Sequence, residues 1–354
     1  MNDAIREAKK QYKASEHKKL ILVAVFLILA AISIPLSLGF GVFKISLFDA
    51  IRVFFEHLIG NITDTKADKY IWNVRLPRAI GAVVIGAGLS VAGAVMQNDF
   101  KNPLAEPYTM GVSSGAFFGV VIALVFGVCL IPGLTGQAAY VTNAFVFSII
   151  PIALILLIAK FKTITPVSMI LIGIAVMFLF NSVSQVFLLA SSAEDLADAY
   201  SWRVGNTARI GWGELPILTL IVIVAVFAVW ALHKKLDVMY AGDRGAQSLG
   251  IIPNRLRIVS MTIVSLMTAS IVAVSGTIGF IGLVGPHIAR MFVGSNNKYL
   301  IPASAAFGAL FIAIADTIAK VTGADGLPVG VISSLVGGPL FVYLLIKNRK
   351  KVWM

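Results

Sequence analysis

Stretches of about twenty apolar residues recur along the whole chain, and each is long enough for a helix to cross the hydrocarbon core of a bilayer. With 58% hydrophobic and only 13% charged residues, the chain lacks the polar surface of a soluble domain. The sequence predicts an all-α, polytopic membrane protein with one transmembrane domain over residues 20–346. Its ten expected spans are Leu20–Phe40, Ala79–Gln97, Tyr108–Leu130, Ala138–Ala159, Pro166–Ala190, Leu215–Leu232, Ile258–Ser275, Gly276–Phe292, Ile301–Ala319 and Leu327–Ile346.

The distribution of lysine and arginine predicts the orientation of these spans. An even number of spans places both termini on one side, and 20 of the 29 Lys and Arg residues then lie on that side. They concentrate in the N-terminal tail 1–19, the connection 233–257 and the C-terminal tail 347–354. By the positive-inside rule both termini are cytoplasmic. The formal charge of +12 is explained by this bias, so we expect no nucleic-acid partner.

The longest external connection, residues 41–78, contains an amphipathic segment at residues 46–59. Its apolar residues recur at helical spacing opposite a charged face, which predicts a short helix on the outer membrane interface. The face expected to pack comprises Leu47, Ile51, Phe54 and Leu58.

Glycine is the notable residue inside the spans. Gly111, Gly115 and Gly119 form a ridge of small residues at helical spacing, and Gly86 and Gly93 lie in the second span. Small residues let two helix backbones approach closely, because lipid supplies no hydrophobic drive for association. We therefore expect tight helix packing at these positions.

Several features that other functions require are missing from the sequence. The deep parts of the spans hold no Asp, Glu, Lys or Arg, whereas ion-coupled transporters usually carry such groups. No Gly-Lys pair occurs, which excludes a P-loop for ATP, and no motif of a zinc or serine hydrolase is present. The single Cys129 builds no disulfide within the chain. We expect a non-enzyme without catalytic residues, metal site or bound cofactor, powered by a partner if transport is active.

Four sequence motifs along the chain indicate which class of membrane protein this is. They are Arg75-Leu-Pro-Arg78 continuing to Asn102-Pro-Leu-Ala-Glu-Pro107; Gly242-Asp243 with Leu249-Gly250; Gly279-Phe-Ile-Gly-Leu-Val-Gly-Pro-His-Ile-Ala-Arg290; and Ala315-Asp316 followed by Leu327-Pro-Val-Gly330. From about Trp72 to Lys347 the chain resembles the iron-siderophore, haem and cobalamin permease family of ABC importers. The resemblance implies a permease dimer in the cytoplasmic membrane, two cytoplasmic ATPase subunits that hold ATP and Mg²⁺, and an extracytoplasmic substrate-binding protein.

The resemblance also implies roles for particular residues. The ATPase-coupling segment would comprise Gly242, Asp243, Arg244, Ala246, Leu249 and Gly250. Arg75, Arg78 and Lys320, on the outer side, would dock acidic residues of the binding protein, although Lys320 alone could equally extend toward lipid headgroups.

An inner gate is implied at Asn102 and Leu104, together with Thr165 and Ser168. Pro166 and Val167 stand there where small polar residues are typical of the family. Asn181 and Gln185 share one face of the fifth span, so they either bridge helices or line the pathway.

The cargo is the least constrained expectation. Iron(III)-siderophore is chosen because it is the commonest cargo class of the family, and haem and cobalamin stay open. A secondary transporter or channel acting alone is the alternative of another class, and ATP-independent uptake would support it. The sequence leaves open whether the permease dimer is homomeric or heteromeric.

Overall fold

A computed structural model of the protein describes residues 2–41, 43–161, 165–240, 242–323 and 326–347, and within these ranges it contains no β-strand. Three short helical turns, η1 (Ile71–Arg75), η2 (Pro107–Met110) and η3 (Thr207–Arg209), lie between the helices. The helices are α1 (Asn2–Leu38), α2 (Leu47–Ile59), α3 (Thr65–Tyr70), α4 (Leu76–Phe100), α5 (Val112–Phe126), α6 (Gly136–Phe161), α7 (Pro166–Leu189), α8 (Ala193–Arg203), α9 (Leu215–Ala231), α10 (His233–Tyr240), α11 (Asp243–Ser248), α12 (Pro253–Ser275), α13 (Ile281–Val293), α14 (Asn297–Val321) and α15 (Val329–Lys347).

The all-α, polytopic architecture is confirmed. Seven of the described helical segments are long and apolar enough to cross a membrane, and α9 with α10 forms a further pair bent by 56°. The shorter apolar helices α5 and α13 fall on the third and eighth predicted spans. Each of the ten predicted spans therefore coincides with an apolar helix.

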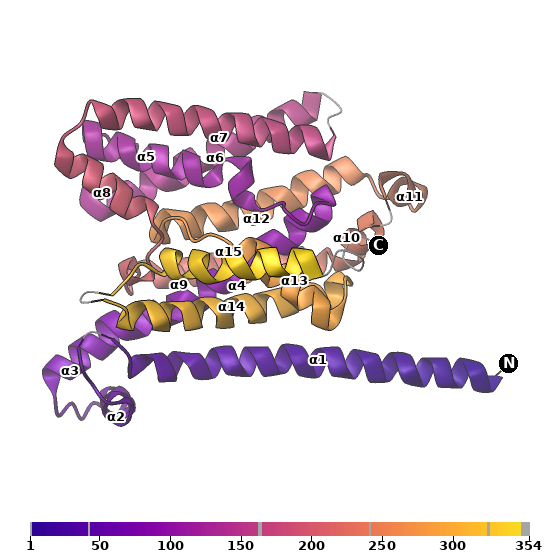
Figure 1. Ribbon diagram of the computed structural model, residues 1–354, viewed down its shortest axis with the longest axis horizontal. Helices are drawn as coiled ribbons and strands as arrows, with labels where there is room; N and C mark the ends of the chain where they lie inside the picture. The colour runs from indigo at the N-terminus through magenta and orange to yellow at the C-terminus, as the bar shows by residue number, and fades with distance from the viewer. Residues whose placement is uncertain (1, 42, 162–164, 241, 324–325, 348–354) are drawn as a thin grey trace.

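The helices lie side by side along one direction, with α4 in the middle of the bundle (Figure 1). α4 packs against α9, α12, α13 and α14, and most of its side chains are buried. The start of α1 and the end of α15 lie at the end of the bundle that carries α11, while α2, α3 and α8 lie at the opposite end. This arrangement agrees with two termini on the cytoplasmic side.

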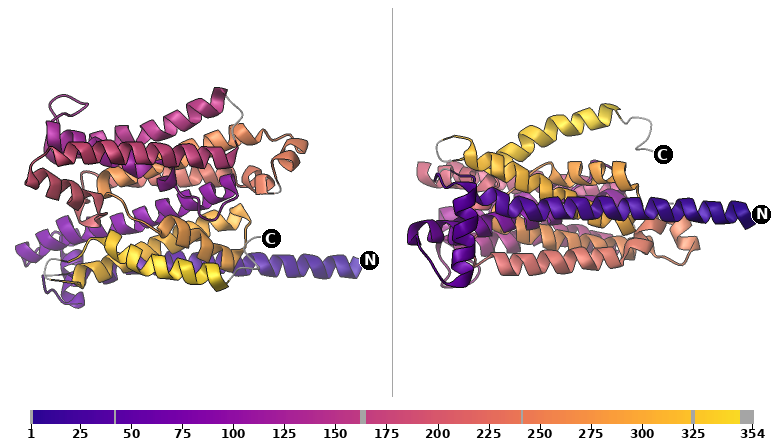
Figure 2. Two further views of the ribbon diagram at one scale, coloured as in Figure 1. Left: turned by 45° about the horizontal axis from the view of Figure 1, so that its top comes forward. Right: turned by 90° about the horizontal axis from the view of Figure 1, so that it is seen from below.

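The first helix continues into the basic N-terminal tail. α1 begins at Asn2, so residues 2–19 of the tail and the first span form one helix, which extends beyond the rest of the bundle (Figure 2). The C-terminal tail lies outside the described residues from position 348 onward.

Glycine brings α4 into backbone contact with its neighbours, as predicted. A Cβ atom on Gly93 would lie 1.8 Å from the carbonyl oxygen of Gly282 in α13, and one on Gly86 would lie 2.1 Å from that of Gly308 in α14. On α5, a Cβ on Gly115 or Gly119 would come within 2.5 Å of a backbone oxygen of α6. Any larger residue at these sites forces two helices apart.

The external helix α2 forms where the sequence predicts it, but its packing face differs. Ser46 caps its N-terminus by accepting a hydrogen bond from the backbone N–H of Asp49 at 3.1 Å. The buried side chains are Ala50 and Val53, and Leu58 is 58% exposed. Leu47, Ile51 and Phe54 of the predicted face are half-buried, so the prediction is wrong only at Leu58, the C-terminal end of this face.

Replacing Gly93 by Ala tests the close approach of α4 and α13. The added methyl group has no space, so we expect a loss of roughly 1–3 kcal/mol and a lower unfolding temperature in detergent, measured by thermal size-exclusion chromatography. Gly213→Ala is the matched control, because a Cβ there meets nothing within 4 Å. Equal unfolding temperatures for the two variants would contradict this packing.

Candidate translocation pathway and coupling site

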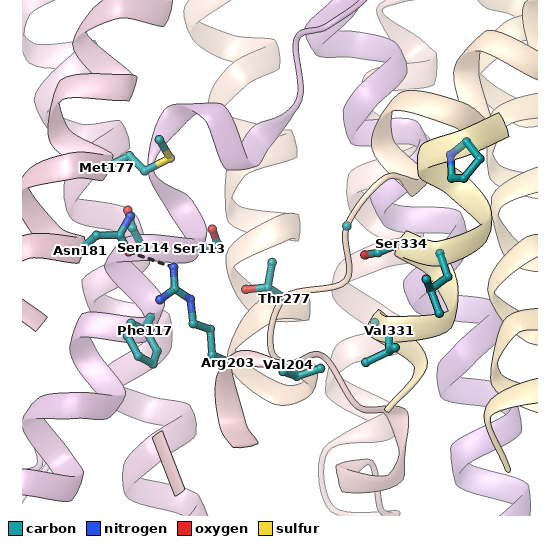
Figure 3. A pocket seen from close by; sticks show the side chains of 14 residues that line it. Ser113, Ser114, Phe117, Met177, Asn181, Arg203, Val204, Thr277, Val331 and Ser334 are labelled. Atoms are coloured by element: carbon teal, nitrogen blue, oxygen red, sulfur yellow. Dashed lines mark hydrogen bonds between the residues drawn. The ribbon is translucent and has the colours of Figure 1, made fainter. Parts of the chain in front are cut away.

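A groove of about 690 Å³ runs between α5 and α7 on one side and α15 on the other (Figure 3). The described residues that line it are Ser113, Ser114, Phe117, Met177, Asn181, Arg203, Val204, Thr277, Gly279, Gly330, Val331, Ser334, Leu335 and Pro339. Hydroxyl groups and an amide thus stand among apolar side chains. Such a surface is mostly apolar and binds a solute weakly, while a few groups can form hydrogen bonds with it. These properties suit a path for a large solute.

Arg203, at the end of α8, is the only charged side chain among the described residues that line this groove. Its guanidinium lies 4.8 Å from the centre of the Phe117 ring and 3.5 Å from the Oδ1 atom of Asn181 (Figure 3). At 3.5 Å the contact to Asn181 is weak, so most of the donors of Arg203 stay available to a solute.

Of the two polar residues expected on the fifth span, Asn181 lines the groove. Gln185 lies one turn further along α7, where it is exposed outside this set of lining residues. Asn181 thus lines the groove and also contacts Arg203 of α8, so it meets both alternatives, and its role in translocation stays a prediction.

The outer part of the groove is built from non-helical backbone. The backbone N–H of Gly205 donates to Thr277 O at 3.0 Å, and that of Gly330 donates to Gly205 O at 2.9 Å. Phe280 has a φ of 66°, a left-handed conformation that is uncommon for a bulky residue. Irregular backbone at membrane depth is tolerated only where it is buried or lines a cavity, which fits this position.

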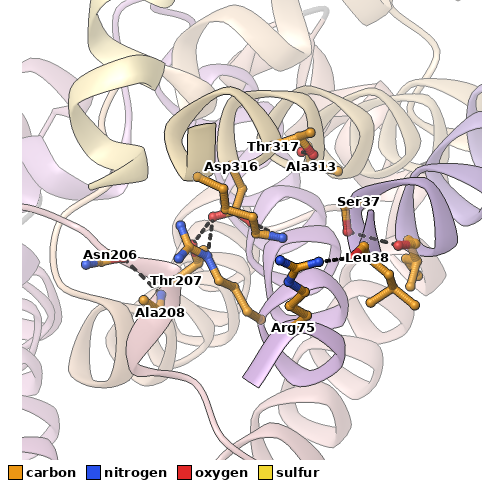
Figure 4. A network of polar contacts seen from close by, with 12 residues as sticks. Ser37, Leu38, Arg75, Asn206, Thr207, Ala208, Ala313, Asp316 and Thr317 are labelled. Carbon is orange, nitrogen blue, oxygen red and sulfur yellow. Dashed lines mark hydrogen bonds and ion pairs between the residues drawn. The ribbon is translucent and has the colours of Figure 1, made fainter. Parts of the chain in front are cut away.

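A polar network joins α4 and α14 at the outer end (Figure 4). Asp316 is 1% exposed, and its carboxylate accepts a hydrogen bond from Arg78 Nε at 2.9 Å and lies 3.0 Å from Lys320 Nζ. Thr207 also donates to Asp316. Arg75 donates to the backbone oxygens of Leu38 and Phe43 instead. One carboxylate therefore faces two cations, with a third nearby.

The three cations predicted to dock a binding protein are turned toward their own chain. Arg75 and Lys320 are 2% and 4% exposed, and the side chain of Arg78 is 15% exposed. Their docking role stays a prediction. Because one carboxylate faces two of these cations and the third lies nearby, the outer end keeps a net positive charge. Its field extends over several ångströms and favours an acidic partner.

The inner end of α4 holds a second polar hub. Gln97 donates to Gly282 O at 3.3 Å and accepts from Arg290 at 3.2 Å, which links α4 to α13. Asn98 donates to Leu236 O in α10 at 3.1 Å. Asp99 is fully buried, and its Oδ2 atom accepts a hydrogen bond from Ser260 in α12 at 2.5 Å. Three successive side chains thus connect α4 to three different helices.

Arg257 extends this hub to the predicted coupling segment. Its side chain is 2% exposed; Nε donates to the backbone oxygen of Asp99 at 2.9 Å, and Nη2 donates to the Asp243 carboxylate at 3.2 Å. Lys101 Nζ lies 3.6 Å from the same carboxylate. The start of α11 is therefore tied to the end of α4 through one buried guanidinium.

The coupling residues divide into an inner and an outer set. Ala246 is fully buried and supports α11 from inside. Arg244 is exposed and Leu249 is 70% exposed, so both are available to a partner. Gly242 and Gly250 have φ values of 111° and 77°, which only glycine adopts readily at the two turns. Contact with an ATPase stays a prediction for this surface.

The predicted gate residues have local structural roles in this conformation. Asn102 Oδ1 accepts from the backbone N–H of Leu104 at 3.0 Å, and Leu104 is 49% exposed. Thr165 caps α7 by accepting from the backbone N–H of Ser168 at 3.2 Å. Their gating role remains a prediction, and the adjoining residues 162–164 lie outside the described part of the chain.

The connection after Leu104 leads to the groove. Burial without a counter-charge raises the pKa of Glu106 to about 7. Tyr108 donates to Ile278 O at 3.2 Å, and a Cβ on Gly173 of α7 would lie 2.7 Å from Thr109 O. The inner connection therefore contacts both the non-helical backbone at the groove and α7.

Sequence reasoning did not predict the contacts of Asp99 and Arg257, and it placed Arg203 only in a polar outer connection expected to border the entrance. The second span was expected to end at Gln97, whereas α4 continues to Phe100 and carries Asp99 inside the helix. The only available signal for Arg203 was its place in a polar outer connection.

Comparison with known proteins is consistent with this geometry. An ABC transporter permease protein of Methanocaldococcus jannaschii is 37% identical over 352 residues, covering 97% of this chain and 99% of its own length. The iron(3+)-hydroxamate import permease FhuG of Bacillus subtilis is 34% identical over 339 residues, covering 95% and 99%. Other relatives are named for Fe(3+)-citrate, cobalamin and hemin transport.

A solved metal-chelate type ABC transporter in an inward-facing conformation matches with a TM-score of 0.81 at 29% identity, covering 92% of this chain and 98% of that one. The fold and these relatives define the permease subunit of an ABC transporter. The chain belongs to the FecCD transport family, whose sequence model matches residues 27–347.

Replacing Asp316 by Asn tests the outer network. The variant leaves Arg78 and Lys320 without a carboxylate, and we expect a loss of roughly 3–5 kcal/mol, because an uncompensated charge stays buried. The measurement is the unfolding midpoint in detergent. Asp49→Asn is the control, since its pair with Arg52 is exposed and should contribute less than about 1 kcal/mol. Similar midpoints for both variants would show that the network carries no such energy.

Proposed function

We propose that the chain imports an iron(III)-siderophore complex across the cytoplasmic membrane as one permease of a dimer. An extracytoplasmic binding protein delivers the complex to the groove, and two cytoplasmic ATPase subunits hold ATP and Mg²⁺ and supply the energy. The chain itself provides a path and two alternating seals, so its work is a shift of population between conformations.

Arg203, the one cation among the described residues that line the groove, supports this cargo most directly. Arg203 offers a guanidinium to a solute, and no carboxylate lies among the described lining residues. A guanidinium binds carboxylate and other oxyanions through charge-assisted, often bidentate hydrogen bonds. An anionic ferric chelate, such as one with carboxylate or catecholate ligands, would therefore be favoured over an uncharged cargo.

Haem and cobalamin are the remaining cargo candidates. Haem also presents carboxylates, so Arg203 supports it as well, whereas cobalamin offers mainly neutral amides to the groove. Selectivity between the iron chelate and haem would then depend on the apolar lining, including Phe117 and Met177, rather than on charge.

Coupling would follow the contacts that join α11 to α4. An ATPase subunit that binds Arg244 and Leu249 would displace α11, and the Asp243–Arg257 pair would transmit the displacement to Asp99 at the end of α4. Asn102 and Leu104 follow directly in the chain. Motion at this end of α4 would therefore move the predicted gate.

Docking would use the surplus positive charge at the outer end. Acidic side chains of the binding protein would approach Arg78 first, because it is the least buried of the three cations there. They would compete with Asp316 for the same guanidinium, so docking and the internal pair would be linked.

Replacing Arg203 by Gln tests the cargo assignment. In proteoliposomes that contain the ATPase and binding protein, we expect uptake of ferric citrate to fall about tenfold, the effect of one charged hydrogen bond. Arg203→Lys should retain part of the uptake, and Arg52→Gln, outside the groove, should leave it unchanged. The measurement is uptake of radioactive iron per transporter. A loss shared equally by cyanocobalamin, or no loss, would contradict selection by charge.

A further inference from the structure

A second groove, of about 550 Å³, lies between α1, α9 and α14 and is unrelated to the pathway. Its walls are almost entirely apolar; Val222 and Val226 of α9 and Ala305 of α14 are among the lining residues, and Ala87 of α4 also contributes. A membrane-embedded groove of this kind is not left empty, since its walls would lose their dispersion contacts. A polar chelate finds no partner here, so the natural occupant is a hydrocarbon chain.

The depth of the groove matches one leaflet. On α9 the lining runs from Trp230, at the cytoplasmic end, to Val222. At 1.5 Å per residue this is about 12 Å. The hydrocarbon core of a bilayer is about 30 Å thick, so the groove reaches from the cytoplasmic interface almost to the midplane. An acyl chain of a lipid in the cytoplasmic leaflet has this reach.

The cytoplasmic mouth of the groove is positively charged. Lys298 Nζ and Lys19 Nζ lie 5.0 Å and 5.4 Å from the centre of the Tyr299 ring. The side chain of Lys298 is 49% exposed and lies 3.4 Å from Glu16, which balances one of the two charges. Lys18 in α1 is also exposed at this level.

Trp230 fixes this mouth at the membrane interface. Its Nε1–H donates to the backbone oxygen of Lys298 at 3.1 Å, while its ring lines the groove. Tryptophan is enriched at the headgroup level for this reason, since one edge is polar and the body is apolar. The apolar groove and the cationic mouth are therefore continuous.

We propose that this groove is a binding site for an anionic phospholipid of the cytoplasmic leaflet, with one acyl chain along α9 and α14 and its phosphate beside Lys298 and Lys19. Basic pockets between transmembrane helices on the cytoplasmic side bind acidic headgroups, and each lysine near the surface favours an anionic lipid about fivefold. The lipid holds α1 against α14, next to the start of α10.

Quenching of Trp230 fluorescence by brominated lipid tests the site. The full chain is placed in nanodiscs of phosphatidylcholine that contain a minor fraction of dibrominated phosphatidylglycerol or dibrominated phosphatidylcholine. Subtraction of the Trp230→Phe signal isolates the reporter. We expect half-maximal quenching at a fraction of brominated phosphatidylglycerol about fivefold lower than the fraction of brominated phosphatidylcholine that gives the same quenching.

Three variants distinguish lipid binding at this site from general attraction of anionic lipid to the protein surface. In Lys298→Gln, the two brominated lipids should reach half-maximal quenching at the same fraction. Lys347→Gln, at another lysine–tyrosine pair on the cytoplasmic end of α15, should leave the difference intact. Ala305→Phe should fill the groove and weaken quenching by both lipids. Equal quenching by the two lipids in the unmodified chain, or an unchanged difference in Lys298→Gln, would overturn the proposal.

Discussion

The contact of α4 with α13 and α14 is the constraint on which the rest of the structure depends. Lipid supplies no hydrophobic drive between helices, so this association depends on backbones that meet at Gly86, Gly93, Gly282 and Gly308. The helix so enclosed is buried on nearly all sides. It can therefore carry polar residues at both ends that no lipid-facing helix would tolerate.

The two ends of α4 serve different sides of the membrane. At the outer end, Arg78 meets Asp316 next to the cations predicted to attract a binding protein. At the inner end, Arg257 donates to the backbone oxygen of Asp99 next to the segment proposed to contact an ATPase. A single helix thus joins both polar clusters. In the proposed function, α4 transmits a displacement from one of its ends to the other, because no flexible connection lies between them.

The architecture could be predicted because its cause is local in the sequence. Apolar length determines a span, lysine and arginine determine orientation, and small residues at helical spacing indicate close packing. The burial of Arg75 could not be predicted, because its partner Leu38 is distant in the sequence and only the tertiary fold brings the two together. Asp316 lies four residues before Lys320 on α14, but the burial of this pair depends on the packing of α14 against α4. The face of α2 was mispredicted at Leu58 for the same reason: apolar periodicity shows amphipathicity but not the rotation set by the neighbouring helices.

In the proposed mechanism, ATP-driven motion of α11 reaches the pathway through Arg257. The most direct test measures ATP hydrolysis and chelate uptake together, in proteoliposomes containing the chain, its ATPase and its binding protein, for the unmodified chain and for Arg257→Met. We expect uptake by the unmodified chain to require ATP, and we expect the variant to hydrolyse ATP while its uptake is lost. Uptake without nucleotide, or full uptake by the variant, would contradict the proposed mechanism.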